Sequence, residues 1–215
     1  MSKAARQARL AEVQAAQRKA DLRRRRLIIL IAVLVAAALV IPTAVIISAE
    51  QRRQAERDET LQEAISSPLP DLVEEPDQDA SHVLDDVDYG TSLPPMGGPH
   101  DPVWQDCGFY DAPVRDENVV HSLEHGAVWL AYSESLGPDD VAVLRSLADE
   151  HAYLLVSPYP GLPGPLVATA WGVQLELDGV DDDRLEVFIA RYLQGPQTPE
   201  PGAACSGGTT ATLQR

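Results

Sequence analysis

A run of 22 residues without charge, Leu27 to Ser48, restricts the fold of this chain more than any other feature of its sequence. As an α-helix the run would be about 33 Å long, enough to cross the ~30 Å hydrocarbon core of a bilayer. It is longer than the roughly 7–15 apolar residues of a cleaved signal peptide. Four arginines at 23–26 precede it directly, and the positive-inside rule then puts the N-terminus in the cytoplasm. We therefore expect a single-pass membrane protein with the lipid bilayer as a partner and its later residues outside the cytoplasm.

The two sides of this run differ sharply in charge. Residues 1–26 hold nine basic and two acidic residues, whereas the five basic residues after position 60 are all arginines in a chain of net charge −16. A basic head and an acidic body are typical of two compartments. An acidic body repels phosphate groups, so we expect no nucleic acid as a partner.

These features divide the chain into six expected parts: a basic cytoplasmic tail (1–26), a transmembrane helix (27–48), a juxtamembrane helix (49–64), an acidic Pro-rich linker (65–88), an extracytoplasmic domain (89–195) and a C-terminal tail (196–215). The linker is too rich in acidic residues and proline to bury enough apolar surface to order itself well. The domain is long enough to build a core of its own.

Within the domain, an irregular segment over 90–116 precedes a series of apolar patterns. They predict a helix beginning at Asp116, a strand over 127–132, a helix over 139–150, a strand over 153–157, a single strand or a strand pair over 166–177 and a helix over 181–193. The fold class is therefore α+β, with helices packed on one sheet. A thioredoxin-like arrangement also accommodates this order, although the chain has no Cys-x-x-Cys pair.

Candidate metal ligands gather between Met96 and Tyr132. His121 and His125 are spaced i, i+4, which puts both rings on one face of a helix. His100 and Glu124 can add further ligands, and Cys107 or Met96 can add sulfur, a set that suits Cu or Zn. The alternative is a structural cluster that holds the irregular segment in place, with Glu124 orienting an imidazole or pairing with an arginine.

His121-Ser122-Leu123-Glu124-His125 also matches the letters H-x-x-E-H of inverted zinc peptidases. In those enzymes the two histidines bind zinc and the glutamate activates water. Here Gly126 follows at once and a strand begins, so the setting differs from the long helix that the motif needs.

The chain has two cysteines, Cys107 and Cys205, both in the part expected outside the cytoplasm. An even number in an oxidising compartment favours a disulfide. It would close a loop of about 100 residues and stabilise the fold by up to ~4.7 kcal/mol. A bridged Cys107 would not be a thiolate ligand, so the two interpretations of this residue compete.

Four short motifs together resemble a known family: Gly97-Gly98-Pro99-His100, Cys107-Gly108-x-Tyr110-x-x-Pro113-Val114, the segment from His121 to Val128, and Ala168-Thr169-Ala170-Trp171-Gly172. The chain is similar in these motifs to the bacterial membrane-anchored proteins grouped as domain of unknown function 3105. The resemblance implies a single-pass protein of the bacterial cell membrane with an extracytoplasmic domain. It implies no activity, so the function has to be argued from the residues themselves.

We therefore expect an extracytoplasmic domain that binds Cu or Zn through His100, His121, His125 and Glu124. Two alternatives stay open. One is a structural or interaction module without metal, with a protein of the cell envelope as its partner. The other is a metal-dependent hydrolase that uses His121, Glu124 and His125.

Overall fold

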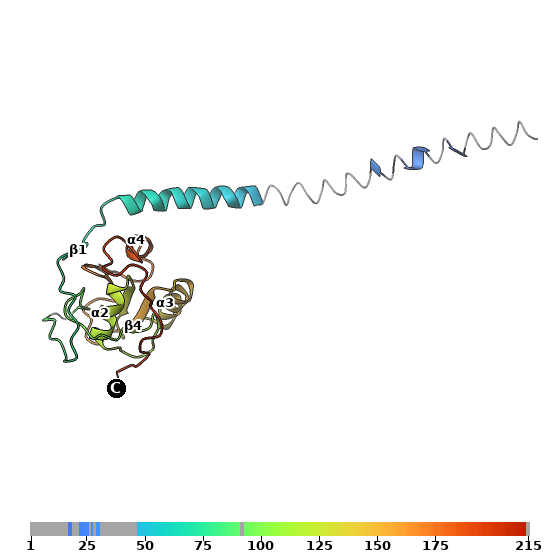
Figure 1. Ribbon diagram of the computed structural model, residues 1–215. Coiled ribbons are helices and arrows are strands. Elements are labelled where there is room, and N and C mark those ends of the chain that lie inside the picture. The colour runs from blue at the N-terminus through green and yellow to red at the C-terminus, as the bar shows by residue number, and fades with distance from the viewer. Residues whose placement is uncertain are drawn as a thin grey trace, which may run out of the picture. The chain divides into compact units, whose positions relative to one another are not determined.

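The computed structural model describes residues 17–18, 22–25, 27, 29–30, 47–90 and 93–213. The chain divides into two compact units, Met1–Thr60 and Leu61–Arg215. Residues 47–66 are helical, a range that includes the helix expected over 49–64, and the folded domain follows in the second unit (Figure 1).

The transmembrane helix in the predicted fold has to be corrected. No helix among the described residues is both long enough and apolar enough to cross a bilayer. The longest described helical stretch, 47–66, carries several glutamates and arginines, and most of its residues are exposed. Residues 31–46, the greater part of the predicted membrane segment, lie outside the described residues.

The described residues of the domain form one mixed sheet of six strands, in the order β1-β6-β5-β3-β4-β2. In chain order its elements are β1 (Val73–Glu74), β2 (Gly108–Phe109), α2 (Asp116–Glu124), β3 (Val128–Tyr132), α3 (Pro138–Glu150), β4 (Leu154–Pro158), β5 (Leu166–Ala170), β6 (Val173–Leu177) and α4 (Arg184–Tyr192). The α+β part of the prediction is therefore correct.

The centre of the sheet consists of a βαβ unit followed by a ββα unit. β3 and β4 are parallel, with α3 as their crossover, and β5 runs antiparallel to both β3 and β6. Trp171 and Gly172 form the tight turn between β5 and β6. Gly172 has a φ of +69°, and a Cβ there would lie 2.8 Å from the Glu75 carbonyl oxygen. Only glycine fits both demands without strain. This βαββα connectivity is one that a thioredoxin-like arrangement also has.

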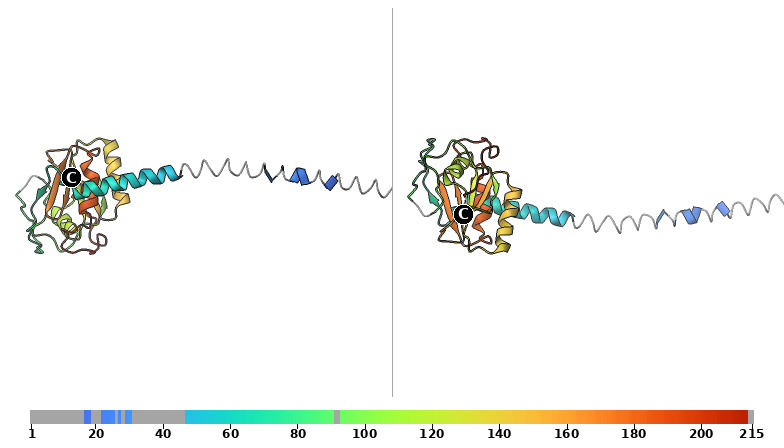
Figure 2. Two further views of the ribbon diagram at one scale, coloured as in Figure 1. Left: turned by 90° about the horizontal axis from the view of Figure 1, so that it is seen from above. Right: turned by 90° about the horizontal axis from the view of Figure 1, so that it is seen from below.

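Helices cover both faces of the sheet (Figure 2). On one face α3 and α4 pack against Val128 and Leu130 of β3, and on the other α2 packs against Trp129 and Ala131. Every residue of β3 is consequently buried. A strand that is covered on both faces consists of consecutive apolar residues, which is why the strand over 127–132 could be predicted from the sequence.

Residues 65–88, expected as an extended linker, lie on the domain. They contain β1, which pairs with β6 at the edge of the sheet. Further along, the Val83 amide donates to the His100 carbonyl at 2.7 Å, and the His100 amide donates to the Ser81 carbonyl at 2.9 Å. Backbone hydrogen bonds thus hold this segment on the domain, and Leu69 and Leu72 pack against its core.

The C-terminal segment is tied to the chain just before β2. Cys107 and Cys205 form the predicted disulfide, with a Cα–Cα distance of 5.4 Å. Around it the Cys107 amide donates to the Cys205 carbonyl, and the Asp106 amide donates to the Thr209 carbonyl, both at 2.8 Å. The chain after α4 is thus fastened to 104–107 by both covalent and hydrogen bonds.

On the face that α2 covers, the first residue of this helix meets a tyrosine. The Tyr159 hydroxyl donates to Oδ2 of Asp116 at 3.2 Å. Burial raises the pKa of the Asp116 carboxyl from 3.8 to about 6, the hydrogen bond from Tyr159 opposes this, and the nearby Glu117 charge adds to it. Ionised Asp116 is therefore disfavoured in the folded state.

We predict that replacing both cysteines by serine lowers the free energy of unfolding by about 4 kcal/mol, because the bridge joins residues 98 positions apart. Denaturant titration with and without reductant measures the loss. Reductant should destabilise the wild type and leave the double variant unchanged. Free thiols that alkylate in the folded, unreduced wild type would contradict the bridge.

We predict that the free energy of unfolding of Asp116→Asn increases relative to that of the wild type as the pH rises from 4 to 7. Because the folded pKa lies above the unfolded one, the favourable contribution of Asp116 is complete below pH 3.8 and is lost as the pH rises through about 6. Denaturant titrations at pH 4, 5, 6 and 7 measure the difference between the two proteins. Asp139→Asn, in the exposed first turn of α3, controls for removing an acid at a helix start. A pH-independent difference for Asp116→Asn would refute the raised pKa.

Candidate metal centre

Helix α2 supplies two side chains of the candidate site. Its acidic first turn, Asp116 and Glu117, suits the positive end of the helix dipole. Gly126, with a φ of +94°, ends the helix in the left-handed conformation that glycine adopts most readily. Between these ends His121 and Glu124 are spaced i, i+3, so they lie on one face of the helix.

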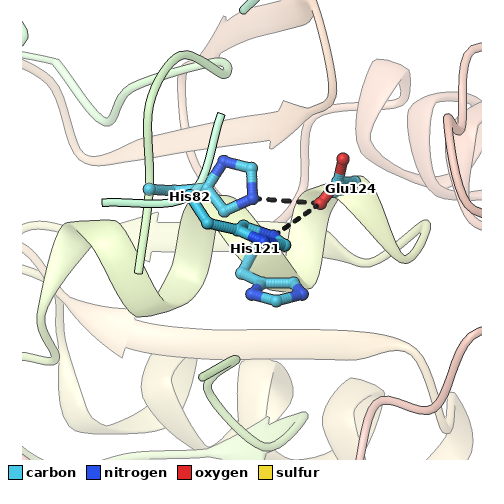
Figure 3. Close-up of side chains that lie close together, drawn as sticks. His82, His121 and Glu124 are labelled. Atoms are coloured by element: carbon cyan, nitrogen blue, oxygen red, sulfur yellow. Dashed lines mark hydrogen bonds and ion pairs between the residues drawn. The ribbon is translucent and has the colours of Figure 1, made fainter. Parts of the chain in front are cut away.

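The other two side chains come from outside the helix. His100 ends the glycine- and proline-rich segment before it, and His82 lies in the expected linker. A parallel β-bridge pairs His82 with His100. The ligand atoms of His82, His100, His121 and Glu124 all lie within 4.8 Å of one another. Figure 3 shows His82 and His121 beside α2, with the carboxylate of Glu124 next to them.

Two of the rings have a fixed proton position. Nδ1 of His100 lies 2.8 Å from the Gly98 carbonyl oxygen, and Nδ1 of His121 lies 2.7 Å from the Asp101 carbonyl oxygen. A carbonyl oxygen can only accept, so Nδ1 carries the proton in both rings. In the neutral ring Nε2 is then the lone-pair atom. Metal-binding histidines usually have this arrangement.

The contact between His100 and Glu124 has no proton to share if the ring is neutral and the carboxylate is ionised. Nε2 of His100 lies 3.0 Å from Oε2 of Glu124. A neutral ring with its proton on Nδ1 and an ionised carboxylate would both present lone pairs there. The contact therefore requires either an additional proton or a cation. It is also deeply placed, because His100 is fully buried and Glu124 is 5% exposed.

His121 is held in the form that binds metals. The pKa of His121 is lowered from 6.5 to about 4, mainly by burial and also by the neighbouring rings of His125, His100 and His82, against the opposing hydrogen bond to the Asp101 carbonyl. The ring is consequently neutral at pH 7.

Aromatic rings enclose the cluster. Trp171 meets His100 edge-on at 5.8 Å between ring centroids, and Trp104 meets His121 at the same distance. The side chain of His82 is 48% exposed. The cluster is therefore buried apart from the side that His82 covers.

His125, expected as a ligand, turns away from the cluster. Its ring contacts that of His121 at 4.5 Å, as the i, i+4 spacing predicts. However, its Nδ1 lies 2.7 Å from the Ala204 carbonyl oxygen, and its Nε2 lies 3.6 Å from Oε2 of Glu200. His125 thus contacts the C-terminal segment, and the H-x-x-E-H letters do not converge on one point.

The two sulfur candidates take other roles. Cys107 is bridged to Cys205 and offers no thiolate. Met96 contributes its backbone carbonyl, which accepts a hydrogen bond from the Gly172 amide at 2.7 Å. Cys107 therefore supplies no sulfur ligand, and the cluster of His82, His100, His121 and Glu124 offers nitrogen and oxygen.

His82 is the residue that the sequence reasoning missed. Its neighbours in sequence include Asp79, Asp85 and Asp86, and this acidic composition predicts a solvent-exposed spacer. The available signal was the presence of a single histidine between Ser81 and Val83 in an otherwise acidic stretch.

Arg115, just before α2, connects the segments that carry the cluster. Its guanidinium lies 2.6 Å from Oδ2 of Asp101, 3.1 Å from Oδ1 of Asp86 and 3.1 Å from Oε2 of Glu117. Glu117 in turn accepts a hydrogen bond from the Val87 amide at 2.7 Å. Arg115 therefore pairs with Glu117 and not with Glu124, which stays with the histidines.

Comparison with known proteins agrees with the motif resemblance. A family model with the description "Protein of unknown function (DUF3105)" matches residues 82–207. The match begins at His82 and includes all four residues of the cluster and both cysteines. Neither the curated proteins nor the solved structures that were compared include a match. Because the family model covers more than half of the 215 residues, the chain belongs to the DUF3105 family.

Proposed function

We propose that this domain binds one divalent transition-metal ion through His82, His100, His121 and Glu124. The observation that carries the proposal is the contact between His100 and Glu124, where an Nδ1-protonated ring and a carboxylate lie 3.0 Å apart and need a proton or a cation between them. A bound cation would satisfy both atoms. Burying this pair without a proton or a cation between them would be costly.

The spacing of the ligand atoms supports this proposal. Atoms that each lie 2.0–2.1 Å from a tetrahedral zinc ion are about 3.3 Å apart. Oε2 of Glu124 is 3.0 Å from Nε2 of His100 and 3.7 Å from Nε2 of His82. Small side-chain rotations would therefore bring these ligands into coordination geometry.

The donor types favour Zn²⁺, with Cu²⁺ as its competitor. Imidazole nitrogen suits both ions, whereas the thiolate that would favour Cu(I) is absent because Cys107 is bridged. Four protein ligands in tetrahedral array are typical of zinc sites that hold the ion. Catalytic zinc sites keep an open position, and the separation of His125 from the cluster removes support for hydrolysis.

The disulfide supports a location for this binding. Structural disulfides persist in oxidising compartments and are rare in the cytosol. The Cys107–Cys205 bridge supports placing the domain outside the cytoplasm, as the charge distribution also predicts.

The test is a metal titration of the purified full chain. After dialysis against Zn²⁺ or Cu²⁺, elemental analysis should find one equivalent in the wild type. His121→Ala and Glu124→Gln should weaken binding by more than about 100-fold, since loss of an outer-shell partner alone costs 10–100-fold. His151→Ala is the matched control, because His151 follows α3 and lies outside the cluster. Sub-stoichiometric metal in the wild type would reject metal binding and leave the structural alternative.

A further variant decides between the two histidine sets. His125→Asn keeps an amide that can donate to the Ala204 carbonyl, as Nδ1 of His125 does. We predict that this variant binds Zn²⁺ within a few-fold of the wild type in the same titration. A loss as large as that of His121→Ala would mean that His125 is a ligand after all.

A further inference from the structure

One ligand of the proposed centre lies on a segment that can leave the domain at little cost. Residues 76–88 are named the flap here, and all of them are described. Before the flap, the Glu75 amide donates to the Gly172 carbonyl at 2.8 Å, next to the pairing of β1 with β6. After it, the Tyr89 hydroxyl donates to the Pro99 carbonyl at 2.9 Å. The flap is therefore a loop that is held at both ends.

Between these ends the flap is attached by polar contacts. Backbone hydrogen bonds join Ser81 and Val83 to His100, and the Val87 amide donates to the side-chain carboxylate of Glu117. None of the 13 flap residues is buried, and Leu84 is 80% exposed. Lifting the flap would remove no fully buried residue from the domain, since its apolar residues Val83 and Val87 are only half-buried.

The ligands differ accordingly. His100, His121 and Glu124 are at most 5% exposed, and each is anchored in the packed part of the domain. The side chain of His82 is 48% exposed and belongs to the flap. Three ligands are thus fixed, and the fourth is attached to a movable segment.

The negative charge of the flap opposes its closure over the site, and a bound cation would offset that charge. The flap carries five aspartates and no lysine or arginine. Without an ion the flap brings these carboxylates to the part of the domain that holds Glu124, and like charges repel. A divalent ion would be the largest local charge and would reverse this balance. Arg115 offsets part of the repulsion by pairing with Asp86.

We propose that His82 is an exchangeable ligand and that the flap closes over the centre when the ion binds. The ion enters and leaves on the flap side, while His100, His121 and Glu124 hold it from below. When the flap is open, the position of His82 is free for an external imidazole, the donor group through which an ion is exchanged with a histidine of another protein. This inference rests on the proposed metal binding and adds its route and its regulation.

Hydrogen exchange of the full chain with and without Zn²⁺ tests flap closure. We expect the amides of the flap to exchange at least ten-fold more slowly in the presence of Zn²⁺. His82→Ala should remove this protection. Asp85→Asn should keep it, because Asp85 lies in the same flap and its side chain makes no hydrogen bond or ion pair with any described residue.

Release of Zn²⁺ to a chromogenic chelator tests the exchangeable ligand. His82→Ala should still bind Zn²⁺ but release it at least ten-fold faster than the wild type and Asp85→Asn, and added imidazole should slow the release. If the wild type binds Zn²⁺ with unchanged flap exchange, or if His82→Ala releases it at the wild-type rate, the gating role of His82 is wrong, while metal binding by His100, His121 and Glu124 stands. If the wild type binds no metal, both fail.

Discussion

The buried contact between His100 and Glu124 sets the demands that the surrounding structure meets. Two polar atoms removed from water need partners, and a charge in such a place needs compensation. The carbonyl of Gly98 accepts from the other nitrogen of the His100 ring, and the ring of Trp171 closes off its edge. The glycine- and proline-rich segment before α2 is irregular because it delivers this one ring to the helix face. Its backbone then serves a second purpose, since it pairs with the flap.

Helix α2 is covered by segments that are distant in sequence. Its apolar residues face the sheet through Val119, Val120 and Leu123. On its polar side the flap approaches from one direction and the C-terminal segment from the other, where the Glu200 amide donates to the Glu124 carbonyl at 3.1 Å. Arg115 and the disulfide fix these two approaches. A helix of nine residues would not be stable alone, so the contacts with the flap and the C-terminal segment account for its stability.

Much of this structure could be predicted from the sequence, and the parts that could not have physical reasons. The apolar runs of β3 to β6 and the periodicity of α3 and α4 identify the core, because buried positions are occupied by apolar residues. Strands of two residues, such as β1 and β2, show no periodicity, so the sheet was expected to be smaller. His82 was missed because backbone hydrogen bonds position it, and these require no particular pattern of apolar residues. The i, i+4 spacing correctly placed His125 beside His121 but could not fix the direction of its ring nitrogens.

The disulfide also gives the domain an order of assembly. The ribosome makes His82 first and Cys205 more than a hundred residues later. The backbone of Trp104, whose ring contacts that of His121, is held by the Thr209 amide, which donates to the Trp104 carbonyl at 2.9 Å. The pocket around the histidines is therefore incomplete while the chain is still being synthesised. Because Cys205 follows all four residues of the cluster in the sequence, the bridge that fixes the C-terminal segment forms only after these residues have been synthesised.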